Sequence, residues 1–338
     1  MNNEIIRIGH GSGGRLSREL INDIFLRYFN NATLKQLNDA ASLSVQKGRI
    51  AFTTDSYVID PIFFPGGDIG QLAVSGTVND LCVSGAIPKF LSAGFIIEEG
   101  FSLINLEKIV ASMAREAKKA GVEIVTGDTK VVRRGQVDKI FINTSGIGII
   151  PEDRFHLSEK LDPAPGDKII ITGTLGDHSI AILSAREKIP LDEIILSDAE
   201  PLTDLVNNVL RKPEEVLFMR DITRGGLATV LVEICENLKF GIEIKEADIP
   251  VFQSVKSVCE LYGFDPLYLA NEGKIVMIVK TGSEQRILDR IKSYDPGNRA
   301  AIIGEITIEH PSKVVIKSII GGRRVVDMLS GEMLPRIC

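Results

Sequence analysis

Apolar residues recur at helical spacing in the best-defined segments of the first half of the chain. Ser102 can cap a helix that Gly121 ends. Its apolar face is made of Leu103, Leu106, Val110, Met113 and Ala117. Asp68 can cap a second helix that runs to about Ser84, and a third follows a glycine-rich start and carries Leu16, Leu20, Ile24 and Phe25. These spacings predict amphipathic helices that each bury one face.

Short runs of β-branched and aromatic residues predict strands between these helices. Residues 43–45 and 49–54 are predicted to pair as a hairpin across the turn at Gln46-Lys47-Gly48. Further strands are predicted over 89–97, 124–126 and 140–150. Strands that alternate with long helices indicate an α/β fold in which helices are layered on a sheet.

Residues 151–166 are the best candidate for a domain boundary, because they hold three prolines and many charges without an apolar period. Beyond them, strands are predicted over 168–172, 242–244, 275–279, 301–308 and 314–319. Helices are predicted over 179–186, 202–210 and 284–293 and after Gly226. The chain therefore divides into α/β domains over 1–155 and 156–325, followed by a flexible tail over 326–338.

The composition is that of an ordinary globular protein, with 44% hydrophobic and 25% charged residues among 338. A net charge of −6 argues against a nucleic-acid or anionic-membrane partner, which would require a basic face. Cys82, Cys235, Cys259 and Cys338 are scattered without a CxxC pair, which excludes a zinc or disulfide framework and fits the reducing cytoplasm. The first three are expected to fill the core. The start of the chain lacks signal-peptide features, and no apolar run has membrane-spanning length.

Four short motifs place an acidic residue beside small residues at the predicted end of a strand or start of a helix. They are Thr54-Asp55-Ser56, Val78-Asn79-Asp80, Thr126-Gly127-Asp128-Thr129-Lys130 and Asp221-Ile222-Thr223-Arg224-Gly225-Gly226. Each alone is typical of a helix cap or a turn. Carboxylates without His or Cys select hard cations such as Mg²⁺, and glycine lets a phosphate approach the backbone. Together with Lys130 they favour a nucleoside triphosphate site, and the lack of a Walker A sequence excludes a P-loop NTPase.

The glycine-rich stretch Gly9-His10-Gly11-Ser12-Gly13-Gly14 matches the GxGxxG pattern formally. A dinucleotide-binding unit would need its second strand where the polar residues 30–38 stand, so the match is weak. A mobile glycine lid and a plain flexible terminus are the two interpretations that remain.

Two further motifs are candidates for chemistry. Glu272, in Asn271-Glu272-Gly273-Lys274, is either a solvated turn residue or, in a closed site, a proton acceptor. The chain ends on Pro335-Arg336-Ile337-Cys338, where Pro335 favours an extended arm that can carry the terminal thiol into a narrow pocket. The alternative is a frayed terminus that happens to end in cysteine.

Taken together, these motifs resemble the HypE family of hydrogenase maturation factors, the carbamoyl dehydratases of the aminoimidazole-ribonucleotide-synthetase-like superfamily. The resemblance covers nearly the whole chain, and its motifs are residues 10–14, 63–68, 125–132, 271–274 and 335–338. The phosphate motifs also fit selenophosphate synthetase and thiamine-monophosphate kinase, whereas the Pro-Arg-Ile-Cys terminus narrows the choice to HypE. Some superfamily members carry a pair of acidic residues at this early position. Here the pair is Asn38-Asp39, so only Asp39 keeps a carboxylate that can bind a metal.

The resemblance implies an ATP-dependent reaction on the protein's own tail. A carbamoyltransferase partner, HypF, loads Cys338 as a thiocarbamate, and ATP phosphorylates the amide oxygen. Loss of phosphate and of the nitrogen protons leaves a thiocyanate, which is passed on as cyanide to an iron-bearing HypC–HypD complex. The cyanide ends as a ligand of the nickel–iron hydrogenase iron. The family also implies a cytoplasmic homodimer in which the N-terminal ATP-binding domains pair.

The resemblance assigns roles to residues of this sequence. Mg²⁺–ATP is assigned to Asp55, Asp80, Asp128 and Asp221, and the nucleotide also to Thr129, Gly11, Gly13 and Gly14. Lys130 is expected near the γ-phosphate or the thiocarbamate, where it neutralises charge on the transferred phosphoryl group. Glu272 is expected to be the base for the amide nitrogen, Cys338 carries the substrate, and Arg336 is expected to pair with a carboxylate or phosphate.

Other functions stay open from the sequence. A phosphotransferase or synthetase of the same superfamily that acts on a free small molecule would leave Cys338 idle. A non-catalytic scaffold that carries a group on Cys338 would show no nucleotide dependence. A Rossmann oxidoreductase would bind NAD.

Overall fold

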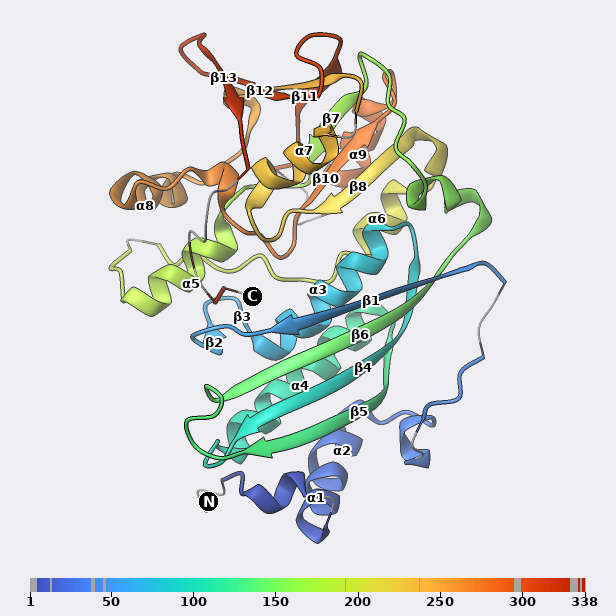
Figure 1. Ribbon diagram of the computed structural model, residues 1–338, viewed down its shortest axis with the longest axis vertical. Helices are drawn as coiled ribbons and strands as arrows, with labels where there is room; N and C mark the ends of the chain where they lie inside the picture. The colour runs from blue at the N-terminus through green and yellow to red at the C-terminus, as the bar shows by residue number, and fades with distance from the viewer. Residues whose placement is uncertain are drawn as a thin grey trace.

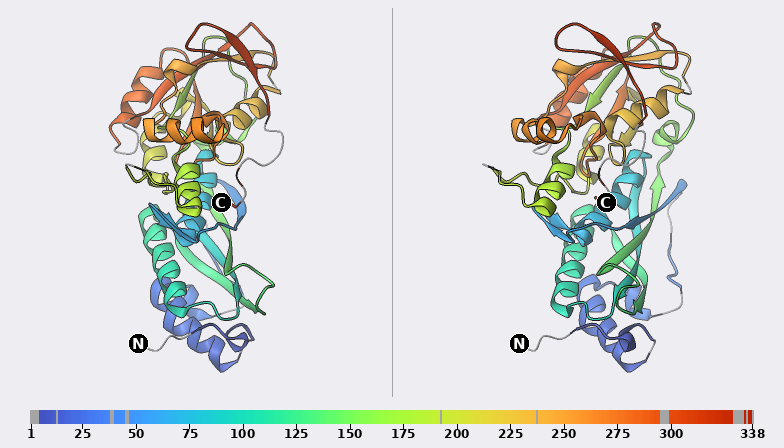
Figure 2. Two further views of the ribbon diagram at one scale, coloured as in Figure 1. Left: turned by 90° about the vertical axis from the view of Figure 1, so that its left-hand side faces the viewer. Right: turned by 60° about the vertical axis from the view of Figure 1, so that its left-hand side comes forward.

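The protein is built from two sheets, each with its own helices. The computed structural model describes residues 5–337 apart from 13, 38–39, 45–46, 192, 237, 295–298, 329–333 and 335. The N-terminal sheet and its helices form the lower half of Figure 1 and the C-terminal sheet the upper half, and the views of Figure 2 keep this elongated arrangement. The predicted layered α/β architecture is confirmed.

The N-terminal sheet has one covered face and one open face. Its strands lie in the order β1 (Arg49–Tyr57), β6 (Ile140–Ile150), β4 (Ile87–Glu98) and β5 (Glu123–Val132). Only the β4–β5 pair is parallel. The helices α3 (Ile69–Val83) and α4 (Leu103–Ala120) pack behind the sheet in Figure 1. The other face leaves large apolar side chains exposed, and the Phe52 side chain on β1 is 68% exposed.

The predicted hairpin between residues 43–45 and 49–54 is wrong. β1 pairs along its whole length with β6, from Arg49 opposite Ile150 to Tyr57 opposite Ile142. Residues 43–44 form no strand, and 45–46 lie outside the described residues. The long-range pairing prevails because it turns one face of β1 toward α3, where Tyr57 is buried and Ala51, Thr53 and Asp55 are half-buried.

The N-terminal segment folds beside β5. Its elements are η1 (Ile8–Gly11), α1 (Arg15–Leu20), a π-helical stretch η2 (Ile21–Phe25), α2 (Leu26–Phe29) and η3 (Leu34–Gln36). The helix predicted from the spacing of Leu16 to Phe25 is present and continues to Phe29. Two short strands, β2 (Phe63–Phe64) and β3 (Gly67–Asp68), lead into α3.

The C-terminal sheet is mostly antiparallel. Its strands lie in the order β13 (Arg323–Val326), β12 (Val314–Lys317), β9 (Gly241–Lys245), β11 (Ala301–Thr307), β7 (Lys168–Ile171), β10 (Ile275–Val279) and β8 (Val216–Asp221). The accompanying helices are α5 (Asp177–Glu187), α6 (Thr203–Val209), α7 (Gly226–Glu236), α8 (Gln253–Tyr262) and α9 (Glu284–Lys292). The segments predicted after residue 166 are all present, whereas β8, α8 and β13 were not predicted.

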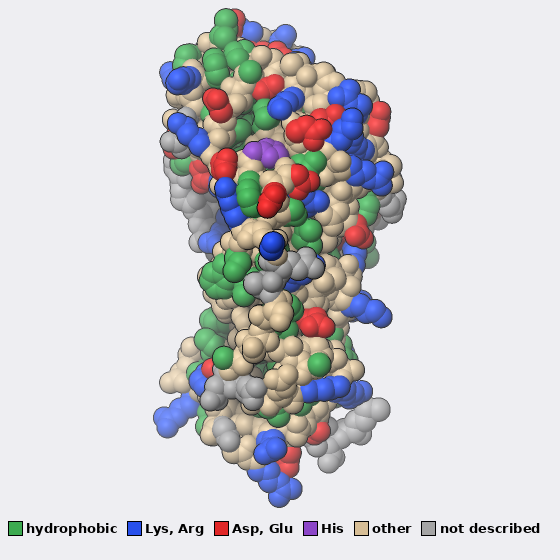
Figure 3. All heavy atoms as spheres, turned by 90° about the vertical axis from the view of Figure 1, so that its right-hand side faces the viewer, with side chains coloured by type: hydrophobic (Ala, Val, Ile, Leu, Met, Phe, Trp, Pro, Cys, Tyr) green, Lys and Arg blue, Asp and Glu red, His purple; other side chains and the backbone are tan. Residues whose placement is uncertain are grey.

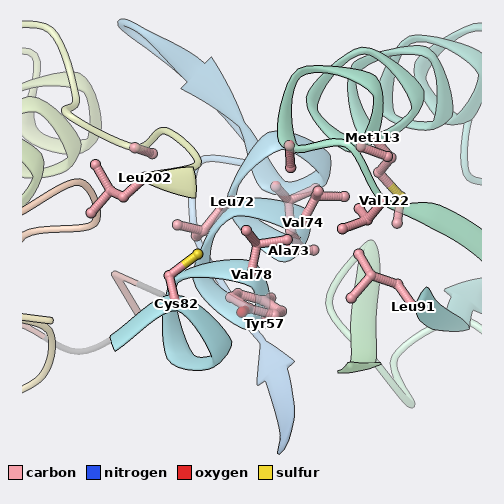
Figure 4. Close-up of a cluster of buried hydrophobic side chains, with 14 of the residues drawn as sticks. Tyr57, Leu72, Ala73, Val74, Val78, Cys82, Leu91, Met113, Val122 and Leu202 are labelled. Atoms are coloured by element: carbon pink, nitrogen blue, oxygen red, sulfur yellow. The ribbon is translucent and has the colours of Figure 1, made fainter. Parts of the chain in front are cut away.

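Helix α3 joins the two halves. Twelve of its fifteen residues are buried, so the helix is covered on all sides rather than along one stripe. Figure 4 shows its side chains between Leu202 on one side and Met113, Val122 and Leu91 on the other. The Asp68 carboxylate caps its first turn by accepting hydrogen bonds from the backbone N–H groups of Gly70 and Gln71.

On the face seen in Figure 3, acidic and basic side chains are interspersed over the C-terminal half. Among the described helices, none is both long enough and apolar enough to cross a bilayer.

The domain limits at residues 155 and 325 stay a prediction. The flexible tail predicted over 326–338 falls largely outside the described residues, since 329–333, 335 and 338 are not described. Leu334, Arg336 and Ile337 are described, and the Ile337 side chain is buried in the main apolar cluster.

Replacing Leu106 by alanine should lower the free energy of unfolding of the N-terminal half by about 2–5 kcal/mol, because its fully buried side chain leaves a cavity. Ile104 lies on the same helix and is 41% exposed, so Ile104→Ala is the matched control, expected to cost less than about 1 kcal/mol. Urea denaturation followed by circular dichroism measures both. Equal losses in the two variants would contradict the assignment of the buried face.

Candidate active site

Three of the predicted acidic residues meet where α3 passes between the sheets. Asp55 lies on β1, Asp80 in the last turn of α3 and Asp221 at the end of β8, and α3 packs against both strands. Burial raises the pKa of Asp80 to about 6, with the Asp55 carboxylate adding to the rise and the Thr53 hydroxyl, which donates a hydrogen bond to Asp80 at 2.7 Å, opposing it. Burial likewise raises the pKa of Asp221 to about 7, and the charges of Asp80 and Asp55 add to it. The three carboxylates therefore form one coupled acidic cluster.

Glu272 belongs to the same site and is not a solvated turn residue. Its side chain is 4% exposed, and its Oε1 atom has no hydrogen-bond partner among the described residues. Burial raises the pKa of Glu272 well above its usual value, and the charges of Asp221, Asp198 and Asp55 raise it further. The proton-acceptor interpretation, which required a closed setting, is the one that this environment supports.

Asp198, which the sequence did not single out, holds the Glu272 loop in place together with Asn79 and Lys274. The Glu272 N–H donates to the Asp198 carboxylate at 3.0 Å, and the Asn79 side chain donates to the Glu272 carbonyl at 3.2 Å. Lys274 pairs with Asp198 at 3.5 Å, and both side chains are buried. A Cβ at Gly273 would lie 1.9 Å from the Asp198 carbonyl oxygen, so this close approach requires glycine. No local pattern marks Asp198, because its partners are about 75 positions away.

Asp128 and Lys130 lie apart from this cluster within one chain. On β4, Gly94 lies in register with Asp128 of β5 on one side and with Asn143 of β6 on the other. Asn143 in turn lies in register with Ser56 of β1, so Asp128 and Ser56 point to the same face of the sheet. Asp55, next to Ser56 on β1, faces the opposite side of the sheet, because successive strand residues alternate. Lys130 pairs with Asp128 at 3.2 Å, and both side chains are exposed on the open face. Thr129 faces the other way, toward the N-terminal helices.

A cavity of about 300 Å³ lies between the N-terminal helices and β5. His10, Gly11, Phe25 and Phe29 line one side of it, and residues 125–130 line the other. A Cβ on Gly11 would come within 2.4 Å of the Val131 backbone nitrogen, so glycine permits this contact. Gly11 therefore packs against the strand that carries Lys130. Gly14 precedes α1, and Gly13 lies outside the described residues.

The described end of the tail is docked, which contradicts a frayed terminus for these residues. The Arg336 guanidinium pairs with the Asp138 carboxylate at 2.7 Å. The Ile337 carbonyl oxygen lies 2.6 Å from Nε2 of His178, the second residue of α5. Pro335 and Cys338 lie outside the described residues.

The other three cysteines fill the core, as predicted. Cys82, Cys235 and Cys259 are buried and free. Burial raises the pKa of Cys82 to about 12 and those of Cys235 and Cys259 to about 11, so these thiols stay protonated and unreactive.

The acidic cluster fits a hard cation that arrives with phosphate. Its donors are carboxylate oxygens only, and positive charge would relieve both their burial and their mutual repulsion, which in that order raise the pKa values of Asp80 and Asp221. Within the described residues, no group of three or more His, Cys, Asp or Glu side chains is arranged to hold a metal ion. Mg²⁺ commonly takes one or two carboxylates with phosphate oxygens and water, so Asp55 and Asp80 suit it better than a cage made of protein alone.

Two family models match the chain. The N-terminal domain model of AIR synthase related proteins matches residues 37–150, and the C-terminal domain model matches residues 164–317. These matches cover the two sheets and the site between them.

Full-length relatives show the same likeness. Carbamoyl dehydratase HypE of Azotobacter vinelandii is 46% identical over 338 residues, which cover 100% of this chain and 98% of that protein. A crystal structure of the hydrogenase maturation protein HypE in complex with ATP superposes with a TM-score of 0.92 at 45% identity, covering 98% of this chain and 99% of that one. A HypE–HypF complex contains a chain that superposes with a TM-score of 0.79 at 48% identity, covering 92% and 99%.

Without metal and nucleotide, the protein should lose stability as the pH rises from about 4 to about 7. In this window the unfolded chain has released the protons of Asp80 and Asp221, whereas the folded chain retains them, so rising pH favours unfolding. Asp221→Asn should weaken this pH dependence and raise the thermal midpoint at pH 8. The exposed Asp23→Asn is the control and should leave the profile unchanged. Thermal midpoints in the presence of a chelator measure the effect, and a flat wild-type profile would contradict the acidic cluster.

Proposed function

This chain belongs to the HypE family of carbamoyl dehydratases, and from that premise we propose that it uses ATP to dehydrate an S-carbamoyl group on its own Cys338 to S-cyano cysteine. The observation that carries the proposal is the docked end of the tail. Ile337, the described residue next to Cys338, contacts His178 of α5, which in turn contacts the segment at Ser197 and Asp198 that holds Glu272.

A short chain of contacts leads from the tail to Glu272. The Ile337 carbonyl accepts from His178 Nε2, and His178 Nδ1 lies 2.7 Å from the Ser197 hydroxyl. Asp198 follows Ser197 and accepts the Glu272 N–H. The end of the tail is thereby connected to the acidic site, which supports a substrate tethered there rather than one that diffuses in.

The reaction needs phosphate because hydroxide is a poor leaving group. The amide oxygen attacks the γ-phosphorus of ATP, the bond to ADP breaks, and one nitrogen proton is removed. The C–O bond then breaks with phosphate as the leaving group, the second nitrogen proton is removed, and a C≡N bond remains. Of the two protons, one ends on phosphate and the other reaches solvent. A tethered substrate favours both steps by its high effective concentration.

Each residue of the site has a role that its environment supports. Asp55 and Asp80 would hold a magnesium ion together with phosphate oxygens, with Asp221 adding negative charge beside them, and the ion would supply positive charge to the phosphate oxygens. Glu272 accepts a nitrogen proton, and its buried setting makes its carboxylate a stronger base than an exposed one. Burial also keeps water from the phosphorylated intermediate, and we propose that the glycine segment at Gly11–Gly14 contributes to that cover.

The position of Lys130 supports a homodimer. Lys130 and Asp128 lie on the open face of the N-terminal sheet, together with exposed Ile50, Phe52 and Ile96. Apolar side chains gathered on one sheet face mark an interaction surface. A second copy packed against this face would bury these side chains and let one protomer's Lys130 and Asp128 serve the cleft that the pair forms.

The proposed partners follow from the reaction. One solved relative is a HypE–HypF complex, which supports HypF as the protein that carbamoylates Cys338 here. The cyanide then requires an acceptor with an open metal position, and we propose a HypC–HypD iron complex for it. We propose that the reaction takes place in the cytoplasm, whose reducing conditions keep the Cys338 thiol available.

Intact mass should record both steps when the protein is incubated with a carbamoyl donor, HypF and ATP. The wild type should gain one carbamoyl group and then lose one water. Lys130→Ala should gain the carbamoyl group but lose water at least about 100-fold more slowly, because charge on the transferred phosphoryl is no longer neutralised. Cys338→Ala should gain nothing.

Cys235→Ala is the matched control, since it removes a buried thiol of α7 that lies outside the apolar clusters joined by Leu334 and Ile337. It should behave as wild type. If Cys338→Ala consumed ATP at the full stimulated rate, or if a free small molecule were phosphorylated, the chain would instead be a phosphotransferase of the same superfamily.

Phe52→Glu should break the homodimer, because it places a charge among the exposed apolar side chains of the open sheet face. Light scattering after size-exclusion chromatography measures the mass in solution. Leu261→Glu, at a position 73% exposed on α8, is the control and should leave the mass unchanged. A dimeric Phe52→Glu protein would refute pairing through this face.

A further inference from the structure

We propose that His178 and Arg186, both on α5, are positioning residues that hold the tail by the backbone carbonyls of Arg336 and Ile337. This inference rests on the proposed function for its catalytic consequence. The grip itself is read from contacts that involve neither nucleotide nor metal. Neither residue carries a role in the motifs read from the sequence.

The surroundings of His178 assign its proton. Its ring is fully buried and lies edge-on to the Phe64 ring at 5.8 Å between centroids. Nε2 lies 2.6 Å from the Ile337 carbonyl, which only accepts, so Nε2 carries the hydrogen. On the other side, the Ser197 oxygen accepts from the Ala199 N–H and so has its own hydrogen available for Nδ1. The ring is therefore held as the neutral Nε2–H tautomer, aimed at the tail.

Arg186 holds the preceding carbonyl. Its Nη2 donates to the Arg336 carbonyl at 2.7 Å and also to the Asp60 carbonyl at 2.7 Å. The Asp60 N–H donates to the same Arg336 carbonyl at 3.3 Å. Arg186 thus connects the tail to the loop that follows β1, the strand on which Asp55 lies.

The backbone at Arg336 shows that the docked conformation is imposed by its surroundings. Its φ is 56°, in the left-handed region that residues other than glycine rarely adopt. Such a conformation persists only where neighbouring contacts hold it. Here the Arg336 side chain is paired with Asp138, and the next side chain, Ile337, is only 8% exposed.

The grip acts on the residue that carries the substrate. Cys338 is bonded directly to Ile337, and consecutive Cα atoms are about 3.8 Å apart. Fixing the Ile337 carbonyl therefore limits where the last residue can reach. Because the two helix residues hold main-chain atoms, they grip the tail equally whether the thiol is free, carbamoylated or cyanated.

A tail that is loaded by one protein and dehydrated in its own cleft has to leave and return. The hydrogen bonds from His178 and Arg186 determine the fraction of time that the tail spends docked. Weakening it should slow dehydration of a loaded chain and leave ATP binding unchanged, since neither His178 nor Arg186 belongs to the acidic cluster.

Trypsin measures docking without any reference to the reaction, because it cleaves after Arg336 and releases the last two residues. Cleavage of His178→Leu and Arg186→Met should be about five- to tenfold faster than that of wild type, the effect of losing one net hydrogen bond. His178→Gln keeps an N–H donor and should restore most of the protection. Arg27→Met, at an exposed arginine of the N-terminal segment, is the control. Intact mass at early times follows the cleavage.

Single-turnover dehydration of preloaded protein gives the second measurement. The rate at saturating ATP should fall about tenfold in His178→Leu and Arg186→Met, with the ATP concentration for half-maximal rate unchanged and His178→Gln close to wild type. If His178 and Arg186 only stabilised the fold, replacing them would lower the thermal midpoint without lowering the dehydration rate at saturating ATP. If His178→Leu does not fold, Arg186→Met carries the test.

Unchanged trypsin protection in the folded Leu and Met variants would overturn the proposal, as would faster cleavage with an unchanged dehydration rate. If wild-type protein loses no water at all while the variants still expose the tail, the proposed function fails and the grip stands. The two failures are thereby distinguishable.

Discussion

The burial of α3 between two sheets is the constraint on which the rest of the molecule depends. A helix covered on all sides has to keep charge off most of its length, and α3 carries no charged side chain before Asp80. Its last turn is the exception, where Asp80 emerges between Asp55 of one sheet and Asp221 of the other. The same packing that joins the two halves therefore concentrates negative charge at their junction. The pKa values of Asp80 and Asp221 are raised first by burial and then by the neighbouring carboxylates, so both effects destabilise the charged cluster without a counter-ion.

Local signals in the sequence predicted much of the fold and of the acidic site. Ser102 and Gly121 bound α4 as expected, with Gly121 in the left-handed conformation at φ 71°. Asp68 caps α3 by the predicted means. Asp55, Asp80 and Asp221 could be predicted because an acidic residue beside small residues, near the end of a strand or helix, is recognisable from a few adjacent residues.

Features decided by long-range pairing could not be read in this way. The predicted hairpin failed because β1 pairs with β6, about ninety positions away, and no local turn reveals that choice. The face on which Asp128 lies follows from the register of β5 with β4, which the sequence does not state. His178 contacts a carbonyl 159 positions along the chain, and a lone histidine after a glycine loop gave no hint of it. The missed helix α8 differs, because Val255, Val258 and Cys259 are spaced as one buried face.

The docked end of the chain has a kinetic consequence. In the proposed reaction the reacting group is carried by the enzyme's own Cys338, so dehydration would be first-order in loaded chains, with a rate constant that does not depend on how much protein the cell contains. Only the preceding transfer is bimolecular and slows when either protein is scarce. As long as the two protomers stay together, dilution retards the loading of the thiol and leaves the conversion of each loaded molecule at its full rate.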